Sequence, residues 1–260
     1  MSGQQVSDEE FSGHVAVVCG ETVCRKALVT KRNRPRYLWI MGRIKDLLGA
    51  SILLAGLLAV TGCQTQPSIK EWRTILDATH TNDWVMVGPG QLIWEKGELV
   101  THGGMGLLVY ERERLGNCQI RVIFKLTETN DNSGVFIRMA NFPKDPWDAV
   151  NHGYEVQIEN KGDDWHRTGC LYSFTKAKNI VNAKLNDWST MVITLKGKRT
   201  IVEVDGQLVT DHTEGDPVPE RLIWYEGERG ERVESGYIGL QNHGHGAEVH
   251  FKEVSVAPVD

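Results

Sequence analysis

Two acidic side chains and an amide occupy alternate positions in the segment NHGYEVQIEN, residues 151–160. Glu155, Gln157 and Glu159 are separated by apolar residues, which is typical of a β-strand with one buried face and one polar face. Carboxyl groups that line a cleft can work as a general acid or a general base. The same alternation also occurs on a solvated outer face. The segment alone leaves both interpretations open.

Other predicted strands place polar residues on the same side. In SGVFIRM (133–139), Val135 and Ile137 are expected to face the core, so Arg138 faces outwards. In GLQNHG, Gln241 and His243 share one side. We interpret the combined surface as the floor of a glycan-binding cleft, because it lacks the Lys residues of an ordinary solvated face. The surface comprises Arg138, Glu155, Gln157, Gln241 and His243, with Glu159 towards one end and His152 and Tyr172 at its edge.

Two segments are long for loops and are expected to carry binding residues, namely 140–152 and 213–235. Each contains a tryptophan, Trp147 in the first and Trp224 in the second. Indole rings at the edge of a glycan site can stack on a ligand. We therefore predict that Trp147 and Trp224 form walls of the cleft and bind substrate together with Gln157, Glu159, Tyr172 and Gln241.

A short histidine pair, His243-Gly-His245, raises the question of a metal. Two imidazoles on one side of a strand can contribute to a divalent metal site, whereas histidines without a ligand role are the commoner case. The glycines around the pair indicate a turn. The sequence establishes no cofactor, and a divalent metal remains an open hypothesis.

The elements that must position these residues are short strands separated by Gly, Asn and Asp. CQIRVIFKL (118–126) alternates apolar residues from Cys118 to Leu126, GCLYSF (169–174) is expected to be another strand, and Asp205-Gly206 is a two-residue hairpin signal. Amphipathic helices are almost absent from the pattern. We predict one all-β domain over residues 69–258, a jelly-roll β-sandwich.

The N-terminal region has the pattern of an export signal. Residues 41–62 combine a short basic start with an apolar run that is too short for a comfortable membrane span, and Cys63 follows them directly. The closing V-T-G-C resembles a bacterial lipobox, which implies lipidation of Cys63. Residues 1–40 are then a doubtful, unstructured extension and 63–68 a tether. We expect a lipid-anchored protein of the bacterial cell envelope, at the outer membrane or the periplasmic face.

Charge and cysteine content narrow the class of partner. The chain has 29 Lys and Arg against 34 Asp and Glu, a net charge of −5, and no clustered basic patch after Cys63. Nucleic acid is therefore not an expected partner, and membrane contact is expected through the lipid. Cys118 falls on an apolar strand face, and the spacing of Cys118 and Cys170 gives no indication of a disulfide.

An ordered set of motifs resembles the 3-keto-disaccharide hydrolase domain of bacterial exported proteins. The motifs are WEKGELVTHGG, NCQIRVIFKL, DNSGVFIRM, HGYEVQIEN, TGCLYSF, NDWSTMVITLKG, VDGQLVTD and GYIGLQNHG. The resemblance covers about residues 69–258 and implies a concanavalin A-like sandwich, in agreement with the strand pattern. It departs from the family pattern at Cys170 and Ser173 and in the charged 224–234 segment.

The resemblance also implies a reaction. The C2 proton of a 3-keto-glycoside is acidified by the ketone, so a base can remove it, and the C1 oxygen then leaves by β-elimination before water adds. Such a site needs one base and one cation or metal at the enolate oxygen. The candidate bases are Glu155, His152 and His243. Arg138 is the candidate cation, expected to pair with Glu155 and keep it ionised.

Two alternatives remain open. Jelly-roll glucanases use an E-x-D-x-E strand, and Glu155-x-Gln157-x-Glu159 keeps that spacing without the middle acid. Four strand residues separate the two α-carbons by about 13 Å, whereas a retaining pair needs carboxyl groups about 5–5.5 Å apart. The same fold also serves as a non-catalytic, lectin-like carbohydrate-binding module.

Overall fold

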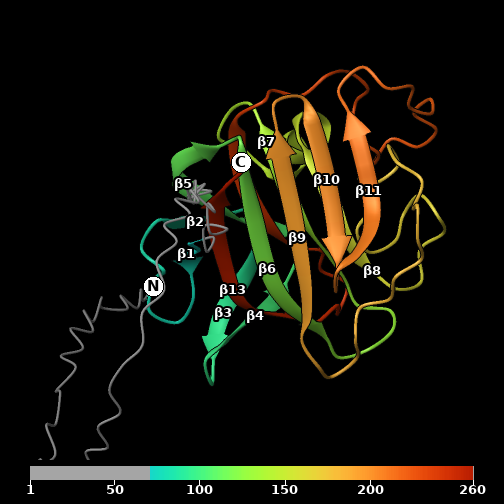
Figure 1. The fold of residues 1–260 in the computed structure, drawn as a ribbon. Helices are drawn as coiled ribbons and strands as arrows, with labels where there is room; N and C mark the ends of the chain where they lie inside the picture. The colour runs from blue at the N-terminus through green and yellow to red at the C-terminus, as the bar shows by residue number, and fades with distance from the viewer. Residues whose placement is uncertain (1–70, 260) are drawn as a thin grey trace, which may run out of the picture. The chain divides into compact units, whose positions relative to one another are not determined.

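The computed structural model describes residues 71–259, which form two antiparallel sheets packed face to face (Figure 1). The larger, 8-stranded sheet has the order β11 (Gln207–Thr213), β10 (Arg199–Val204), β9 (Ser189–Lys196), β6 (Cys118–Leu126), β13 (Val249–Pro258), β4 (Glu98–Gly103) and β3 (Gly90–Glu95), with β1 (Arg73–Leu76) paired to β13. The smaller, 5-stranded sheet has the order β2 (Trp84–Val87), β5 (Gly106–Leu115), β12 (Gly236–Asn242), β7 (Asn132–Met139) and β8 (Tyr154–Glu159). The predicted jelly-roll sandwich is confirmed.

The core lies between the two sheets and follows the alternation of the sequence. On β6 every second residue from Cys118 to Leu126 is buried, and on β8 the buried apolar side chains are Tyr154, Val156 and Ile158. Full burial of one large apolar side chain stabilises the fold by roughly 1.5–3 kcal/mol. Because Val156 and Ile158 face the core, their neighbours on β8 must face away from it.

The predicted hairpin at Asp205-Gly206 joins β10 to β11. Both residues have positive φ angles, 46° and 76°, as a two-residue turn of the primed type requires. The predicted strand at 169–174 is wrong. That segment runs along the edge of β8 in an irregular conformation. The backbone amide of Gln157 donates to the backbone carbonyl of Cys170, and the backbone amide of Tyr172 donates to that of Glu155, each at 2.9 Å. Tyr172 is thereby placed beside Glu155.

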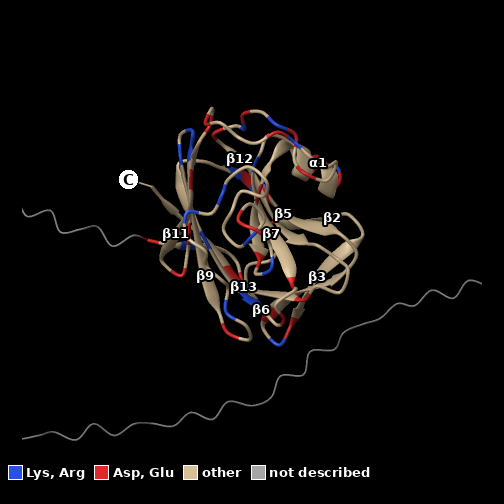
Figure 2. Ribbon diagram, turned by 90° about the vertical axis from the view of Figure 1, so that its right-hand side faces the viewer, with Lys and Arg blue, Asp and Glu red and all other residues tan. Residues whose placement is uncertain are grey.

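The outer face of the smaller sheet is partly covered by a short helix, α1 (Pro146–His152), which lies within the first long insert (Figure 2). The helix begins where the Asp145 carboxylate accepts a hydrogen bond from the Asp148 amide at 2.8 Å. A second apolar cluster fills the space between helix and sheet: Leu107, Val109, Phe136, Met139, Ala149 and Val150. The remainder of this face, beside the helix, is left for a pocket.

Several predictions fall outside the described residues, namely the extension 1–40, the signal 41–62, the tether 63–68 and the lipid site Cys63. Within 71–259, no helix is long and apolar enough to cross a membrane. Cys118 and Cys170 are both buried.

Candidate functional site

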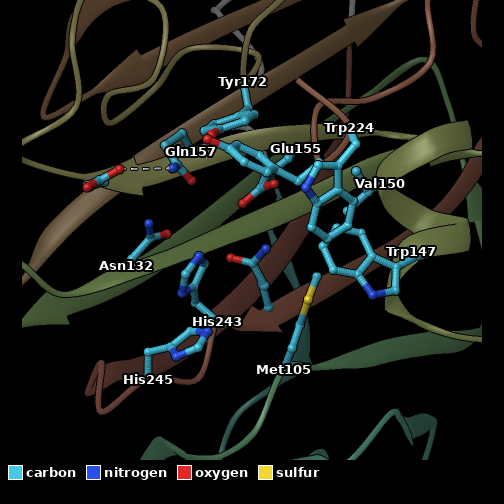
Figure 3. Close-up of a pocket in the computed structure, with 13 residues that line it drawn as sticks. Met105, Asn132, Trp147, Val150, Glu155, Gln157, Tyr172, Trp224, His243 and His245 are labelled. Carbon is cyan, nitrogen blue, oxygen red and sulfur yellow. Dashed lines mark hydrogen bonds between the residues drawn. The ribbon is translucent and has the colours of Figure 1, made fainter. Parts of the chain in front are cut away.

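A pocket of about 580 Å³ lies on the outer face of the smaller sheet (Figure 3). We call it the β8 pocket, because β8 contributes the acidic residues of its floor. Eight of the residues predicted for the cleft line it: Glu155, Gln157, Glu159, Tyr172, Gln241, His243, Trp147 and Trp224. The outer face of this sheet is therefore a cleft and not a flat solvated surface.

Five lining residues were missed by the sequence analysis: Met105, Asn132, Val150, Tyr225 and His245. Asn132 was detectable, because it lies on β7 two residues before Gly134 and so shares the outward side of that strand. Tyr225 follows Trp224 in the second insert, and His245 belongs to the histidine pair. Met105 and Val150 carry no polar signal that distinguishes them from core residues.

Glu155 lies at the centre of the floor, directly over a glycine. A Cβ atom added at Gly134 on β7 would lie 2.6 Å from the Glu155 carboxylate, so the absence of a side chain at Gly134 makes room for the acid. The pKa of Glu155 is raised to about 8, mainly by burial; a hydrogen bond from Gln241 opposes this shift, and the charge of Glu159 adds to it. Within residues 71–259, Glu155 has no ion pair. A carboxyl group titrating near neutral pH is suited to proton transfer.

Three amide side chains surround the acids. The Gln157 amide nitrogen donates to the Glu159 carboxylate at 3.3 Å, and burial raises the pKa of Glu159 as well. Gln241 is held by a hydrogen bond from the Ser133 hydroxyl to its backbone carbonyl at 2.6 Å. Among the described residues 71–259, the side-chain oxygens of Gln241 and Asn132 find no hydrogen-bond partner. Unpartnered acceptors beside a pocket favour a ligand that brings donors, as hydroxyl groups do.

Tyr172 supplies a hydroxyl to the pocket, near Glu155. Burial raises its pKa well above the ordinary value, and the nearby Glu155 charge acts in the same direction. Its ring packs edge-on against His166, with centroids 4.6 Å apart. Tyr172 therefore stays protonated at physiological pH and can donate a hydrogen bond.

The histidine pair lines the pocket at the polar end (Figure 3). The rings of His243 and His245 have centroids 5.9 Å apart, across a turn in which Gly244 and His245 have positive φ angles of 81° and 56°. Burial lowers the pKa of His243, and the His245 charge adds to this effect, so its imidazole is neutral at pH 7. In the part of the chain that the structure describes, no set of three His, Cys, Asp or Glu side chains is arranged to hold a metal.

The prediction that Arg138 lies in the cleft opposite Glu155 is wrong. Arg138 is fully buried and donates to the Thr200 hydroxyl at 2.9 Å and to the carbonyls of Gly197 and Val233 at 2.9 Å. The cause is local, because Arg138 has a φ of 56° where the β7–β12 register shifts, which reverses the alternation. Arg138 is therefore a structural residue joining β7 to the β9–β10 turn.

His152 is also misplaced by the sequence analysis. It forms the last residue of α1 and is exposed, and its imidazole contacts the Asp148 carboxylate at 2.8 Å. It does not line the β8 pocket but a separate surface depression beside Phe142 and Lys144. The helix rotates the side chain away from the position that an extended chain would have given it. Glu155 and His243 are the two candidate bases that remain in the pocket.

Comparison with known proteins matches the domain to one protein family and to solved structures of the same fold. Residues 71–257 match the family described as the 3-keto-alpha-glucoside-1,2-lyase-like domain. A structure named "Putative glycosyl hydrolase" from Parabacteroides distasonis ATCC 8503 superposes with a TM-score of 0.59 at 19% identity, covering 73% of this chain and 100% of that chain. A second structure of that description and organism gives 0.52 at 19% identity, covering 73% and 88%.

No curated protein matches the chain. The solved structures establish the sandwich fold, and the family match covers more than half of the chain. The protein therefore belongs to the 3-keto-alpha-glucoside-1,2-lyase-like domain family, the same family that the sequence motifs resemble.

Proposed function

We propose that the protein is an enzyme that cleaves the glycosidic bond of 3-keto-glucosides by elimination, with Glu155 as the base. The observation that carries this proposal is the Glu155 carboxyl group on the pocket floor, without an ion pair in residues 71–259 and with a pKa raised by burial to about 8. A base with such a pKa is ionised in a useful fraction at neutral pH and basic enough to take a carbon-bound proton. Family membership supports the substrate class.

The reaction has two stages. Glu155 takes the proton from C2, and the electron pair of that bond moves to the C3 carbonyl to give an enolate. The enolate then expels the C1 oxygen, which leaves as an alcohol after receiving a proton, and a C1=C2 double bond forms. Water adds across this bond, so the net products are 3-keto-glucose and the free alcohol.

The negative charge that develops on the enolate oxygen must be stabilised by donors in the pocket. Arg138 cannot serve, since its guanidinium is used by backbone carbonyls outside the pocket. The Tyr172 hydroxyl and the neutral His243 imidazole are two donors that line the same pocket as Glu155. The carbonyl oxygens of Asn132 and Gln241 complement them by accepting from sugar hydroxyls.

The decisive experiment incubates the purified protein with a 3-keto-glucoside and with the unoxidised parent, each with and without a chelator. Cleavage of the keto form alone is expected. Cleavage of the parent would instead support a glucanase-like hydrolysis by Glu155 and Glu159. Binding of either compound without turnover would support a lectin-like module. Loss of turnover on adding the chelator would indicate that the reaction requires a bound metal ion.

We also propose that the domain is attached to a bacterial membrane by lipid on Cys63, because a basic start, an apolar run and V-T-G-C precede the domain. Radioactive palmitate should label the full-length chain expressed in bacteria, and the label should be absent from Cys63→Ser. Equal labelling of both proteins would contradict the lipid anchor.

A further inference from the structure

The two ends of the β8 pocket differ in chemistry (Figure 3). Asn132, His243 and His245 lie at one end, and Trp147 and Trp224 lie at the other. Glu155 lies between them. A ligand that spans the pocket across Glu155 therefore meets hydrogen-bonding groups on one side and apolar surface on the other.

The apolar end is built mainly from rings. Trp147 and Trp224 have centroids 4.9 Å apart and an interplanar angle of 45°, and Tyr225 packs edge-on against Trp224 at 5.7 Å. Trp147 is 39% exposed and Trp224 is 69% exposed, so much of both indoles is uncovered. Val150 and Met105 complete this end of the pocket. We call these five residues the aromatic wall.

The aromatic wall is held by contacts between the two inserts that carry it. Arg232, in the second insert, donates to the Asn151 carbonyl at 2.9 Å and to the Gly153 carbonyl at 3.0 Å, at the end of α1. Glu226 accepts from the Leu222 amide and from Arg229, each at 3.0 Å. The segment bearing Trp224 is thus fixed on both sides, which lowers the conformational entropy that binding a ligand would cost.

The chemistry of the wall suits an apolar group better than a second sugar. Val150 and Met105 offer no strong hydrogen-bonding group, each indole offers one N–H donor, and Tyr225 adds a single hydroxyl. A second sugar in contact with this end would leave several hydroxyls without partners, which costs about 1–3 kcal/mol for each one buried. A flat aromatic group would cover the indole faces without that cost.

We infer that the aromatic wall binds the leaving group, and that the preferred substrates are 3-keto-glucosides of aromatic or other apolar alcohols in place of disaccharides. This inference rests on the proposed function for the position of the scissile bond at Glu155. The sugar ring then lies at the end with Asn132 and His243. The alcohol lies along Trp147 and Trp224.

The test compares benzyl and methyl 3-keto-glucosides of the same anomeric configuration, since benzyl alcohol and methanol are leaving groups of similar basicity. We expect kcat/KM for the benzyl compound to exceed that for the methyl compound by about tenfold or more. A 3-keto-disaccharide should resemble the methyl compound. The preference should shrink to within about twofold in Trp224→Ala and in Trp147→Ala. Trp188→Ala is the control, because Trp188 directly precedes β9 of the larger sheet, where its ring lies under Lys125.

Binding separates this inference from the proposed function. The unoxidised benzyl and methyl glucosides are titrated against the full chain by calorimetry, which requires no turnover. Tighter binding of the benzyl compound that is lost in Trp224→Ala supports the aromatic wall even if no 3-keto-glucoside is cleaved. Equal kcat/KM values and equal affinities for the benzyl and methyl compounds overturn the inference, and so does a higher kcat/KM for the disaccharide.

Discussion

The outer faces of the two sheets differ in how their charged side chains are partnered. On the larger sheet, Arg121 lies 2.7 Å from Glu253 and Lys125 lies 2.8 Å from Glu98, so these four charges form two pairs. On the smaller sheet Glu155 has no such partner in residues 71–259, and its pKa is raised by burial. One face neutralises its charges at the surface, while the other holds a carboxyl group that changes protonation near neutral pH.

The difference arises from what covers each face. The sequence alternates polar and apolar residues on β6 as it does on β8. The outer face of the smaller sheet, however, lies under α1 and the second insert, which supply the aromatic wall and remove water from around Glu155. Desolvation, and not the alternation itself, makes the acid a candidate for catalysis.

The largest expected effect comes from Glu155→Gln, which keeps the shape of the side chain and removes the base. We expect kcat on a 3-keto-glucoside to fall by about 10⁴-fold, which corresponds to roughly 5 kcal/mol. Binding of the unoxidised glucoside should change little. The matched control is Glu253→Gln on the larger sheet, which should leave kcat unchanged. Equal losses in the two variants would remove the distinction between the faces.

Arg138→Met tests whether the buried arginine belongs to the fold or to the site. The substitution leaves the carbonyls of Gly197, Val233 and Arg199 without their donor, so we expect the free energy of unfolding to fall by about 4 kcal/mol. Urea denaturation measures this loss. At a temperature where the variant is folded, kcat should stay within about threefold of wild type. A variant with the stability of wild type but without turnover would show that Arg138 belongs to the catalytic site.

Strand alternation predicted the sandwich and most of the pocket floor. Val156 and Ile158 had to face the core, and this fixed the outward direction of Glu155 and Gln157. The position of Trp224 in a long insert predicted its place at the pocket edge. These inferences needed only the period of a strand and the tendency of loops to carry binding residues.

The same alternation gave wrong side-chain directions at two places. In one the strand is irregular, and in the other the chain forms a helix. A positive φ at Arg138 sends its side chain towards the β9–β10 turn, and nothing in the residue type indicates it. His152 is rotated away by a helix of seven residues, too short to show a clear periodicity. The raised pKa of Glu155 depends on α1 and the second insert, whose packing cannot be read from local pattern.

The pH dependence of stability is the next largest effect. Because burial raises the pKa of Glu155 from 4.5 to about 8, the folded protein keeps a proton that the unfolded chain releases between those values. The free energy of unfolding should therefore fall as pH rises through this window, an effect that Glu155→Gln lacks. One pKa unit corresponds to about 1.4 kcal/mol, but Glu155 is only partly buried and water screens the effect. We therefore expect the variant to match wild type at pH 4 and to exceed it by about 2 kcal/mol at pH 8, roughly half of what the full shift would give. Over the same range kcat/KM of wild type should rise, since the ionised form is the base. A kcat/KM that falls over this range would indicate that the protonated form of Glu155 is the active one, so that it acts as a general acid.

The smallest effect is expected for the paired charges of the larger sheet. Arg121 and Glu253 are partly exposed, so water and salt screen their attraction, and a double-mutant cycle with Arg121→Ala and Glu253→Ala should give a coupling of about 0.5 kcal/mol. The cycle is needed because Arg121 also donates to the Ser255 hydroxyl at 3.1 Å and stacks on Trp72, contacts that Arg121→Ala removes as well. The coupling should decrease further in about 1 M salt, where charges are screened within about 3 Å. Turnover of a 3-keto-glucoside should be the same in all four proteins. A coupling above about 2 kcal/mol, or a change in kcat with either substitution, would mean that this face is more than a solvated surface, because an exposed pair without a ligand has no means of reaching such a value.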